Sequence, residues 1–206
     1  MIIVDYYFHS PSPWAYLAGP RFNELIKRKN LQVNWKPIDL FAIFKITGQK
    51  MVKNRAPQVQ INRLNELRRW SEFLKMPINV EPKYFPPDGL PANKLIIAAI
   101  ILKKDVALLV NNLMEAVWVK EKDIGRTDVI IEVANDYGYE GKTLYDLSNK
   151  PEVKKILKGN TEEAIDKNIF GVPTWIYNKE LFWGQDRLDF LERAIDKNIS
   201  NNRNSK

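Results

Sequence analysis

Two strand-like stretches flank one helical stretch at the start of the chain. Residues 2–8 carry β-branched and aromatic side chains, which predicts a strand, and residues 31–35 repeat that pattern before Pro37. Residues 13–29 predict an amphipathic helix, because apolar side chains recur there at helical spacing. These side chains are Trp14, Leu17, Ala18, Phe22, Leu25 and Ile26. The chain therefore opens with a β-α-β unit.

Helical patterns dominate residues 41–168. A helix over residues 58–75 is predicted to have one apolar face, formed by Ile61, Leu64, Leu67, Trp70 and Leu74. Residues 92–104 are apolar nearly all round, which predicts a central, buried helix. Further helices are expected over residues 106–120, from Thr127 or Asp128 to Gly138, from Pro151 towards Gly159, and from Thr161 onwards.

Strand patterns return after this helical block. Residues 174–177 and 181–183 predict a β-hairpin, and Asp186 is expected to cap a final helix. Residues 200–206 are polar and expected to be disordered. The order β-α-β, helical block, β-β-α predicts an α/β fold in which four strands form one sheet. Residues 1–40 and 169–199 would make one domain, interrupted by a helical insertion over 41–168.

The amino-acid composition excludes several kinds of catalytic and metal-binding site. A chain of 206 residues with 45% hydrophobic content can bury a full core. It has no cysteine, which excludes disulfides and catalysis by a protein thiol. Its single histidine argues against a histidine metal site or a catalytic triad, and we expect no metal.

Charge and hydropathy indicate which kinds of partner the protein can bind. The net charge of +7 comes from scattered Lys and Arg, with short clusters at 27–29 and 68–69, so we expect no nucleic acid partner. The N-terminus has no basic segment before its apolar run, which argues against a secretory signal. The longest apolar run, 95–102, is far shorter than the roughly 20 residues that span a membrane. These features predict a cytoplasmic protein without a membrane partner.

Ser12 and Pro13 stand where the first strand meets the first helix. Serine as the cap and proline in the first turn are common at helix starts, so a structural role is one interpretation. A helix start also presents unpaired N–H groups and a partial positive charge. A hydroxyl there can donate a hydrogen bond to an anion, and a thiolate bound there would have a pKa below the usual value of about 8.5.

Two later segments have the same double interpretation. A cis Val172–Pro173 bond would turn the Val172 N–H and C=O outward to pair with an extended peptide ligand, whereas a trans bond would simply start a strand. Gln185 and Asp186 stand at the start of the last helix. They either cap it or bind the carboxylate and the ammonium group of a ligand.

His9, the only imidazole, has either a purely structural role or a catalytic role beside this site. Trp14 belongs to the core unless it faces an aromatic substrate.

Three segments resemble a known family: residues 4–18, 170–174 and 183–188. They are similar to 2-hydroxychromene-2-carboxylate isomerases, which belong with kappa-class glutathione transferases in the DsbA-like branch of the thioredoxin superfamily. The resemblance implies a thioredoxin-like fold with a large helical insertion and implies glutathione as cofactor. Two positions depart from the family pattern. His9 stands where an acid is usual, and Gln185 where a shorter Asn or Ser is usual.

The resemblance also assigns roles. Ser12 would stabilise the glutathione thiolate, Val172 beside Pro173 would bind the cysteinyl backbone, and Gln185 with Asp186 would bind the γ-glutamyl end. Gln49, in the loop after the second strand, is a further candidate for contacting glutathione.

The implied function is a glutathione-dependent isomerase that acts on a small aromatic or electrophilic substrate, as a homodimer. Two alternatives stay open: a kappa-like transferase that conjugates electrophiles, and a DsbA-like binding or chaperone module without chemistry.

Overall fold

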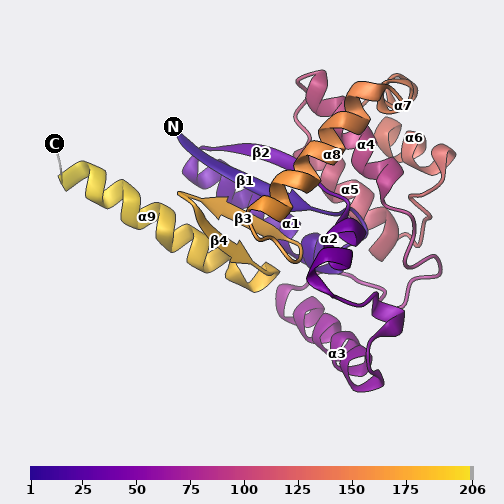
Figure 1. Ribbon diagram of the computed structural model, residues 1–206, viewed down its shortest axis with the longest axis horizontal. Coiled ribbons are helices and arrows are strands. Elements are labelled where there is room, and N and C mark those ends of the chain that lie inside the picture. Colours follow the sequence, from indigo (N-terminus) through magenta and orange to yellow (C-terminus); the bar gives the residue numbers. More distant parts are fainter. Residues whose placement is uncertain (205–206) are drawn as a thin grey trace.

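A four-stranded mixed sheet runs through the molecule (Figure 1), and the computed structural model describes residues 1–204. The sheet has the order β2-β1-β3-β4. Its strands are β1 (Ile2–Phe8), β2 (Leu31–Pro37), β3 (Thr174–Tyr177) and β4 (Glu180–Trp183). β1 pairs parallel with β2 and antiparallel with β3, and β3 pairs antiparallel with β4. This arrangement confirms the predicted α/β fold, with a β-α-β unit at one end of the chain and a β-β-α unit at the other.

Both faces of the sheet are buried, because successive side chains of a strand point to opposite faces. On one face Tyr6 stacks on Trp175, with ring centroids 5.4 Å apart, and packs against Phe22. On the other face Tyr7 belongs to a separate apolar cluster with Ile38 and Ala164. The sheet therefore forms the middle layer of the molecule.

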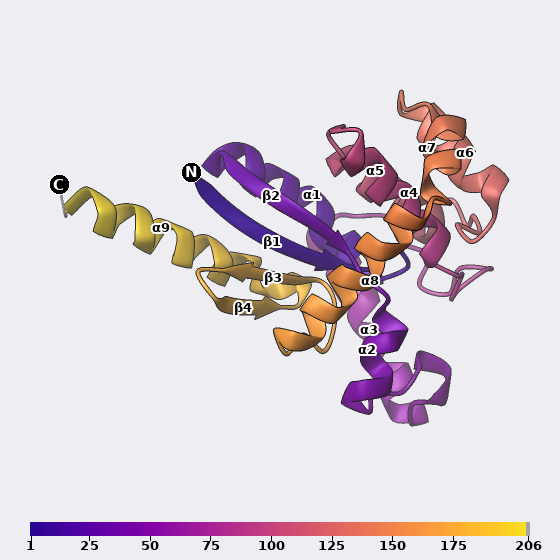
Figure 2. The ribbon, with the colours of Figure 1, turned by 45° about the horizontal axis from the view of Figure 1, so that its top comes forward.

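Three helices cover these two faces. The first face packs against α1 (Pro13–Lys29) and α9 (Leu188–Asn204), and the second against α8 (Pro151–Asp166). Figure 2 shows α8 crossing the sheet near the ends of β1 and β2, while α9 extends away beside β3 and β4. The ends of β1 and β2 thus lie close to the helical block.

The helical block lies between β2 and β3 in sequence and gathers at the end of the sheet opposite the tail of α9 (Figure 1). Besides α8, its elements are α2 (Leu40–Thr47), the short 3₁₀ helix η1 (Val52–Asn54), α3 (Pro57–Leu74), α4 (Leu90–Ile101), α5 (Ala107–Trp118), α6 (Thr127–Asp136) and α7 (Gly141–Ser148). α4 is buried on several sides, as its apolar sequence predicted.

Several local predictions were wrong. α8 continues through Gly159, because Val153, Leu157, Thr161 and Ala164 form one buried stripe along it. That burial outweighs the cost of about 1 kcal/mol for a glycine inside a helix. α6 starts after Arg126, and no side chain makes a capping bond there. On α3 the predicted apolar face is incomplete, because Ile61 is 60% exposed.

Another error concerns the C-terminus. α9 runs to Asn204, so residues 200–204 are helical where a disordered tail was expected. The rest of that predicted tail, residues 205–206, lies outside the described residues.

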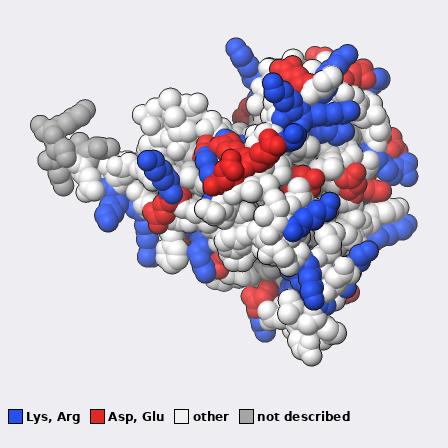
Figure 3. All heavy atoms as spheres, viewed as in Figure 1, with Lys and Arg blue, Asp and Glu red and all other residues white. Residues whose placement is uncertain are grey.

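The surface carries mixed charge. On the face shown in Figure 3, blue Lys and Arg side chains are interspersed with red Asp and Glu side chains. Within residues 1–204 no helix is both long enough and apolar enough to cross a bilayer.

Candidate active site

A cavity of about 380 Å³ opens where β1 ends and α1 begins. Cavities of this size accommodate small molecules. Its wall comes from the β1–α1 turn, from α2 and the loop after it, from the first turns of α3, from residues 85–86 and from the segment around β3 and β4. Of the residues expected at the site, it is lined by His9, Ser12, Trp14, Gln49 and Val172.

Ser12 caps α1 and also lines the cavity. Its backbone is extended and its Oγ accepts a hydrogen bond of 3.3 Å from the Ala15 N–H, while Pro13 occupies the first turn. The predicted cap is therefore confirmed. Because Oγ acts as acceptor in this bond, the hydroxyl hydrogen remains able to donate, and it has no acceptor among the described residues. The hydroxyl and the positive end of α1 together favour an anion here.

His9 lies beside Ser12 in a buried polar network that includes Asn93 of α4. The Asn93 Oδ1 accepts hydrogen bonds from the Ser10 backbone N–H, at 3.1 Å, and from the Ser10 hydroxyl, at 2.7 Å. These two donors fix the orientation of the amide. Its Nδ2 group therefore donates to the Ile38 carbonyl, at 2.9 Å, and points at His9 Nδ1, at 3.0 Å. His9 Nδ1 also lies 3.2 Å from the Ile38 carbonyl, which only accepts, so its two neighbours favour opposite tautomers and either ring nitrogen of neutral His9 can carry the proton.

His9 is uncharged at neutral pH. Burial lowers the pKa of His9 to about 4. Nε2 is buried and has no hydrogen-bond partner among the described residues. Gly89 makes this packing possible, since a Cβ there would lie 2.7 Å from His9 Cε1 and 2.4 Å from Pro11 Cδ. His9 therefore has one ring nitrogen, Nε2, without a partner among the described residues, but it cannot supply a positive charge.

Val172 lines the same cavity and precedes a cis peptide bond to Pro173, as predicted. Among the described residues nothing hydrogen-bonds to its N–H or C=O. Gln49 is fixed nearby, because its Nε2 donates to the Phe170 carbonyl at 2.7 Å. Trp183 completes this wall and explains Gly171, where a Cβ would lie 2.5 Å from the Trp183 Nε1.

Gln185 and Asp186 are not among the residues that line the cavity. They lie in the 3₁₀ helix η2 (Gln185–Arg187), which precedes α9. Gln185 is buried, and both its side-chain oxygen and its carbonyl accept hydrogen bonds from Arg21. Asp186 pairs with Arg187 at 2.6 Å and makes no capping bond. The predicted cap at Asp186 is therefore wrong, and its role in glutathione binding stays a prediction.

Sequence reasoning missed two residues of this site. Asn93 could have been recognised as an uncharged polar residue in a helix predicted to be buried, where its amide must find partners. Arg63 of α3 stands four residues before Leu67, which is the one buried residue of that helix. Residues four apart lie on the same face of a helix, and this spacing could have placed Arg63 beside the buried side of α3. Together with Lys53 and Arg55, Arg63 makes the cavity basic, and no Asp or Glu is among the described residues that line it.

Burial and the nearby charge of Arg55 lower the pKa of Arg63 to about 10, so Arg63 is still a cation at neutral pH.

Comparison with known proteins shows the family to which this chain belongs. A family model described as the DSBA-like thioredoxin domain matches residues 3–196. The chain belongs to the DsbA-like thioredoxin family. It differs from a thiol oxidoreductase in having no cysteine. The chemistry of this DsbA-like cavity therefore does not use a protein thiol.

Individual relatives confirm the expected resemblance. A 2-hydroxychromene-2-carboxylate isomerase from Pseudomonas sp. (strain C18) is 27% identical, over 95% of this chain and 91% of its own length. Glutathione S-transferase kappa 1 from Caenorhabditis elegans is 23% identical, over 94% of this chain and 91% of its own length. The solved structure of a 2-hydroxychromene-2-carboxylate isomerase has the same fold, with a TM-score of 0.86, 24% identity and full coverage of both chains.

Proposed function

We propose that this protein is a glutathione-dependent isomerase of the 2-hydroxychromene-2-carboxylate type. The observation that carries the proposal is the full-length similarity to proteins of that name, in a chain without cysteine whose cavity contains the Ser12 hydroxyl. An isomerisation needs no external oxidant or reductant, which agrees with the absence of a protein thiol. The proposed substrate is a small aromatic molecule.

The cavity residues suit glutathione at its thiol end. The Ser12 hydroxyl has a hydrogen to donate, and the start of α1 adds partial positive charge. The Val172 N–H and C=O have no partners among the described residues, as a site for an extended peptide requires. The Gln49 side chain lies beside them. These groups would bind the cysteinyl part of the cofactor.

When bound, glutathione would supply a nucleophilic thiolate that adds reversibly to a conjugated enone, so that the former double bond can rotate. The protein would hold that anion through Ser12, and the neutral His9 would offer Nε2 as a further polar contact. Trp14, half-buried in the same wall, would contact an aromatic substrate. No side chain of the protein would form a covalent bond.

A kappa-like glutathione transferase is the second candidate, and the relative from Caenorhabditis elegans favours it. Both enzymes would bind glutathione, whereas a non-catalytic DsbA-like binding module would not need to. The deciding experiment is a calorimetric titration with glutathione, followed by an assay with 2-hydroxychromene-2-carboxylate. Isomerised product with unchanged free thiol supports the isomerase. Loss of free thiol indicates conjugation, and no glutathione binding indicates the binding module.

We also propose that the protein acts in the cytoplasm as a homodimer. Two large apolar side chains of α3, Ile61 and Phe73, are 60% and 77% exposed, and a dimer interface would cover such side chains. Sedimentation velocity would test the dimer, and a monomer at micromolar concentration would contradict it.

A further inference from the structure

Arg63 is a partly buried cation without a counter-charge. It lines the cavity, and it forms no hydrogen bond or ion pair with any described residue. Other arginines of the chain do have partners: Arg69 pairs with Glu66, and Arg126 with Asp128. Desolvating a guanidinium is costly unless an anion or acceptors compensate it. The position therefore calls for an acceptor that the protein itself does not provide.

Aromatic rings hold the Arg63 guanidinium in place. Its central carbon lies 5.0 Å from the ring centroid of Phe85 and 5.8 Å from that of Trp118. Rings bind the flat face of a guanidinium, so its N–H groups, which lie in the plane, stay available to a ligand. Its Nη2 is buried and has no partner among the described residues. A carboxylate is the group that matches two such N–H donors side by side.

The surroundings of Arg63 also favour an anion. Lys53 and Arg55 line the same cavity. Gln60, one turn before Arg63 on α3, donates to the Arg55 carbonyl at 2.8 Å and so ties this basic loop to the helix. None of the described residues that line the cavity is an Asp or a Glu, so no carboxylate of the wall neutralises these cations. The cavity thus offers a positive field around one guanidinium held by two rings.

We propose that Arg63 binds the carboxylate of the substrate and selects aromatic acids over their neutral counterparts. The inference rests on the proposed function and deepens it by naming a specificity-determining residue. A substrate carboxylate fits better than a glutathione carboxylate, because the Arg63 guanidinium lies against the Phe85 ring, and Phe85 lines the cavity as an apolar wall that suits an aromatic substrate. The aromatic frame of the substrate would lie along the Phe85 and Pro86 wall.

Steady-state kinetics test the role of the charge. Arg63→Met, which keeps an apolar side chain against the rings, should raise KM for the carboxylate substrate by about 10- to 100-fold, as expected for a lost charge-assisted hydrogen bond. The KM for glutathione should change less than about twofold. Arg63→Lys keeps the charge and should lose less. Arg68→Met is the matched control, because Arg68 lies on the same helix with its side chain 50% exposed.

Two kinetic outcomes overturn the proposal. One is an unchanged substrate KM in a folded Arg63→Met or Arg63→Gln variant. The other is a raised KM for glutathione with an unchanged KM for the substrate, which would assign Arg63 to the cofactor.

A binding experiment separates this inference from the proposed function. Salicylate and its neutral amide, salicylamide, have the same ring but differ in charge. The wild-type protein should bind the acid more tightly in a calorimetric titration, and Arg63→Met should abolish that preference. Equal binding of the two by the wild type, or a preference that survives in Arg63→Met, overturns the role of Arg63. A wild-type protein that prefers the acid but shows no glutathione-dependent turnover instead contradicts the isomerase function alone.

Discussion

At the residue scale, the site depends on side chains with one unused hydrogen-bonding group. Ser12 accepts from the start of its own helix and keeps its hydroxyl hydrogen for a ligand. His9 contacts Asn93 and the Ile38 carbonyl through Nδ1 and keeps Nε2. Both side chains are buried, so each unused group is aligned in advance and would gain a strong bond from a bound ligand.

Replacing Ser12 should show how much the residue contributes to the stability of the fold and how much to catalysis. Ser12→Ala should lower the free energy of unfolding by about 0.5–2 kcal/mol, because the cap is lost. It should reduce kcat by about 10²–10³, by analogy with the loss of an oxyanion donor, and raise the pKa of bound glutathione. The measurements are urea unfolding, steady-state rates and the absorbance of the thiolate.

Ser12→Gly is the control, because glycine as a cap costs only a few tenths of a kcal/mol. It should lose as much activity as Ser12→Ala while staying more stable. Full activity in either folded variant would remove Ser12 from the proposed mechanism.

His9 should make stability depend on pH in the acid range. Burial lowers its pKa from 6.5 to about 4, so the folded state binds this proton more weakly than the unfolded state. This contribution is therefore complete above pH 6.5 and is lost as the pH falls through about 4. The loss is about 3 kcal/mol, at 1.36 kcal/mol per pKa unit. Urea unfolding between pH 7 and pH 4 would measure it.

Carboxylates also titrate in this pH range and change the free energy of unfolding. The wild type is therefore compared with His9→Gln at each pH. His9 is the only histidine of the chain, and the difference between wild type and variant isolates its imidazole. That difference should shrink towards low pH. Parallel curves for the two proteins would show that the imidazole is not buried as described.

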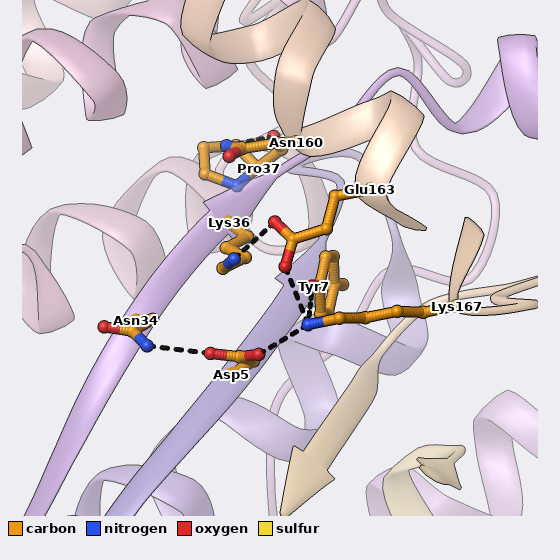
Figure 4. A network of polar contacts seen from close by, with 8 residues as sticks. All are labelled: Asp5, Tyr7, Asn34, Lys36, Pro37, Asn160, Glu163 and Lys167. Atoms are coloured by element: carbon orange, nitrogen blue, oxygen red, sulfur yellow. Dashed lines mark hydrogen bonds and ion pairs between the residues drawn. The ribbon is translucent and has the colours of Figure 1, made fainter. Parts of the chain in front are cut away.

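At the element scale, a polar network joins α8 and the residue after it to the sheet (Figure 4). Lys167 Nζ lies 2.9 Å from Asp5 of β1, 2.7 Å from Glu163 of α8 and 3.1 Å from the Tyr7 hydroxyl. Lys36 of β2 pairs with the same Glu163. Burial alone would raise the pKa of Glu163, but hydrogen bonds from Lys167, Lys36 and Tyr7 outweigh it and lower that pKa to about 2. The network thus fastens α8 across the face of the sheet.

Removing the charge of Glu163 should therefore loosen α8. Glu163→Gln should lower the free energy of unfolding by about 1–2 kcal/mol at pH 7, a charge-assisted bond reduced by its partial exposure. Because the folded-state pKa is lowered, this stabilisation is present above pH 4.5 and is lost as the pH falls through about 2. Urea unfolding at several pH values would measure both effects.

Glu162→Gln is the matched control on the same helix. Glu162 pairs with Lys158 at 3.4 Å and its side chain is 60% exposed, so its loss should cost less than about 0.5 kcal/mol. Equal losses in the two variants would contradict the role of the network.

At the scale of the whole molecule, the cavity joins segments from both ends of the chain and from the helical block. A ligand that binds there should stabilise the folded protein as one unit. Glutathione at 100 times its Kd should add about 2.7 kcal/mol, which raises Tm by about 5–10 °C for a domain of this size. A thermal scan with and without glutathione measures the shift, and no shift at millimolar glutathione would contradict the cofactor.

The same scan tests the proposed γ-glutamyl site. Asp186→Ala should reduce the glutathione-dependent shift, because the ligand ammonium would lose a carboxylate. Arg187→Gln removes the present partner of Asp186 without removing that carboxylate, so it should keep the shift. If Asp186→Ala responds to glutathione like the wild type, the γ-glutamyl end binds elsewhere.

Local signals were enough to predict several features from the sequence alone. Ser12 and Pro13 mark the start of a helix through their own backbone preferences, and the hairpin turn lies at Asn178 and Lys179, both with positive φ. The strand and helix order followed from hydrophobic periodicity, and the family from three short segments. Such features depend on residues within a few positions of one another, so they can be predicted before the chain is folded.

Tertiary structure decided what the local signals left open. Gly159 stays helical because a buried stripe stabilises α8 on both sides of it. Gln185 bonds to Arg21, 164 residues earlier, instead of lining the cavity. The partner that orients His9 is Asn93, 84 residues later. Burial gives these polar groups a free-energy cost that only a distant partner can offset, and the sequence alone does not show which partner the fold brings near.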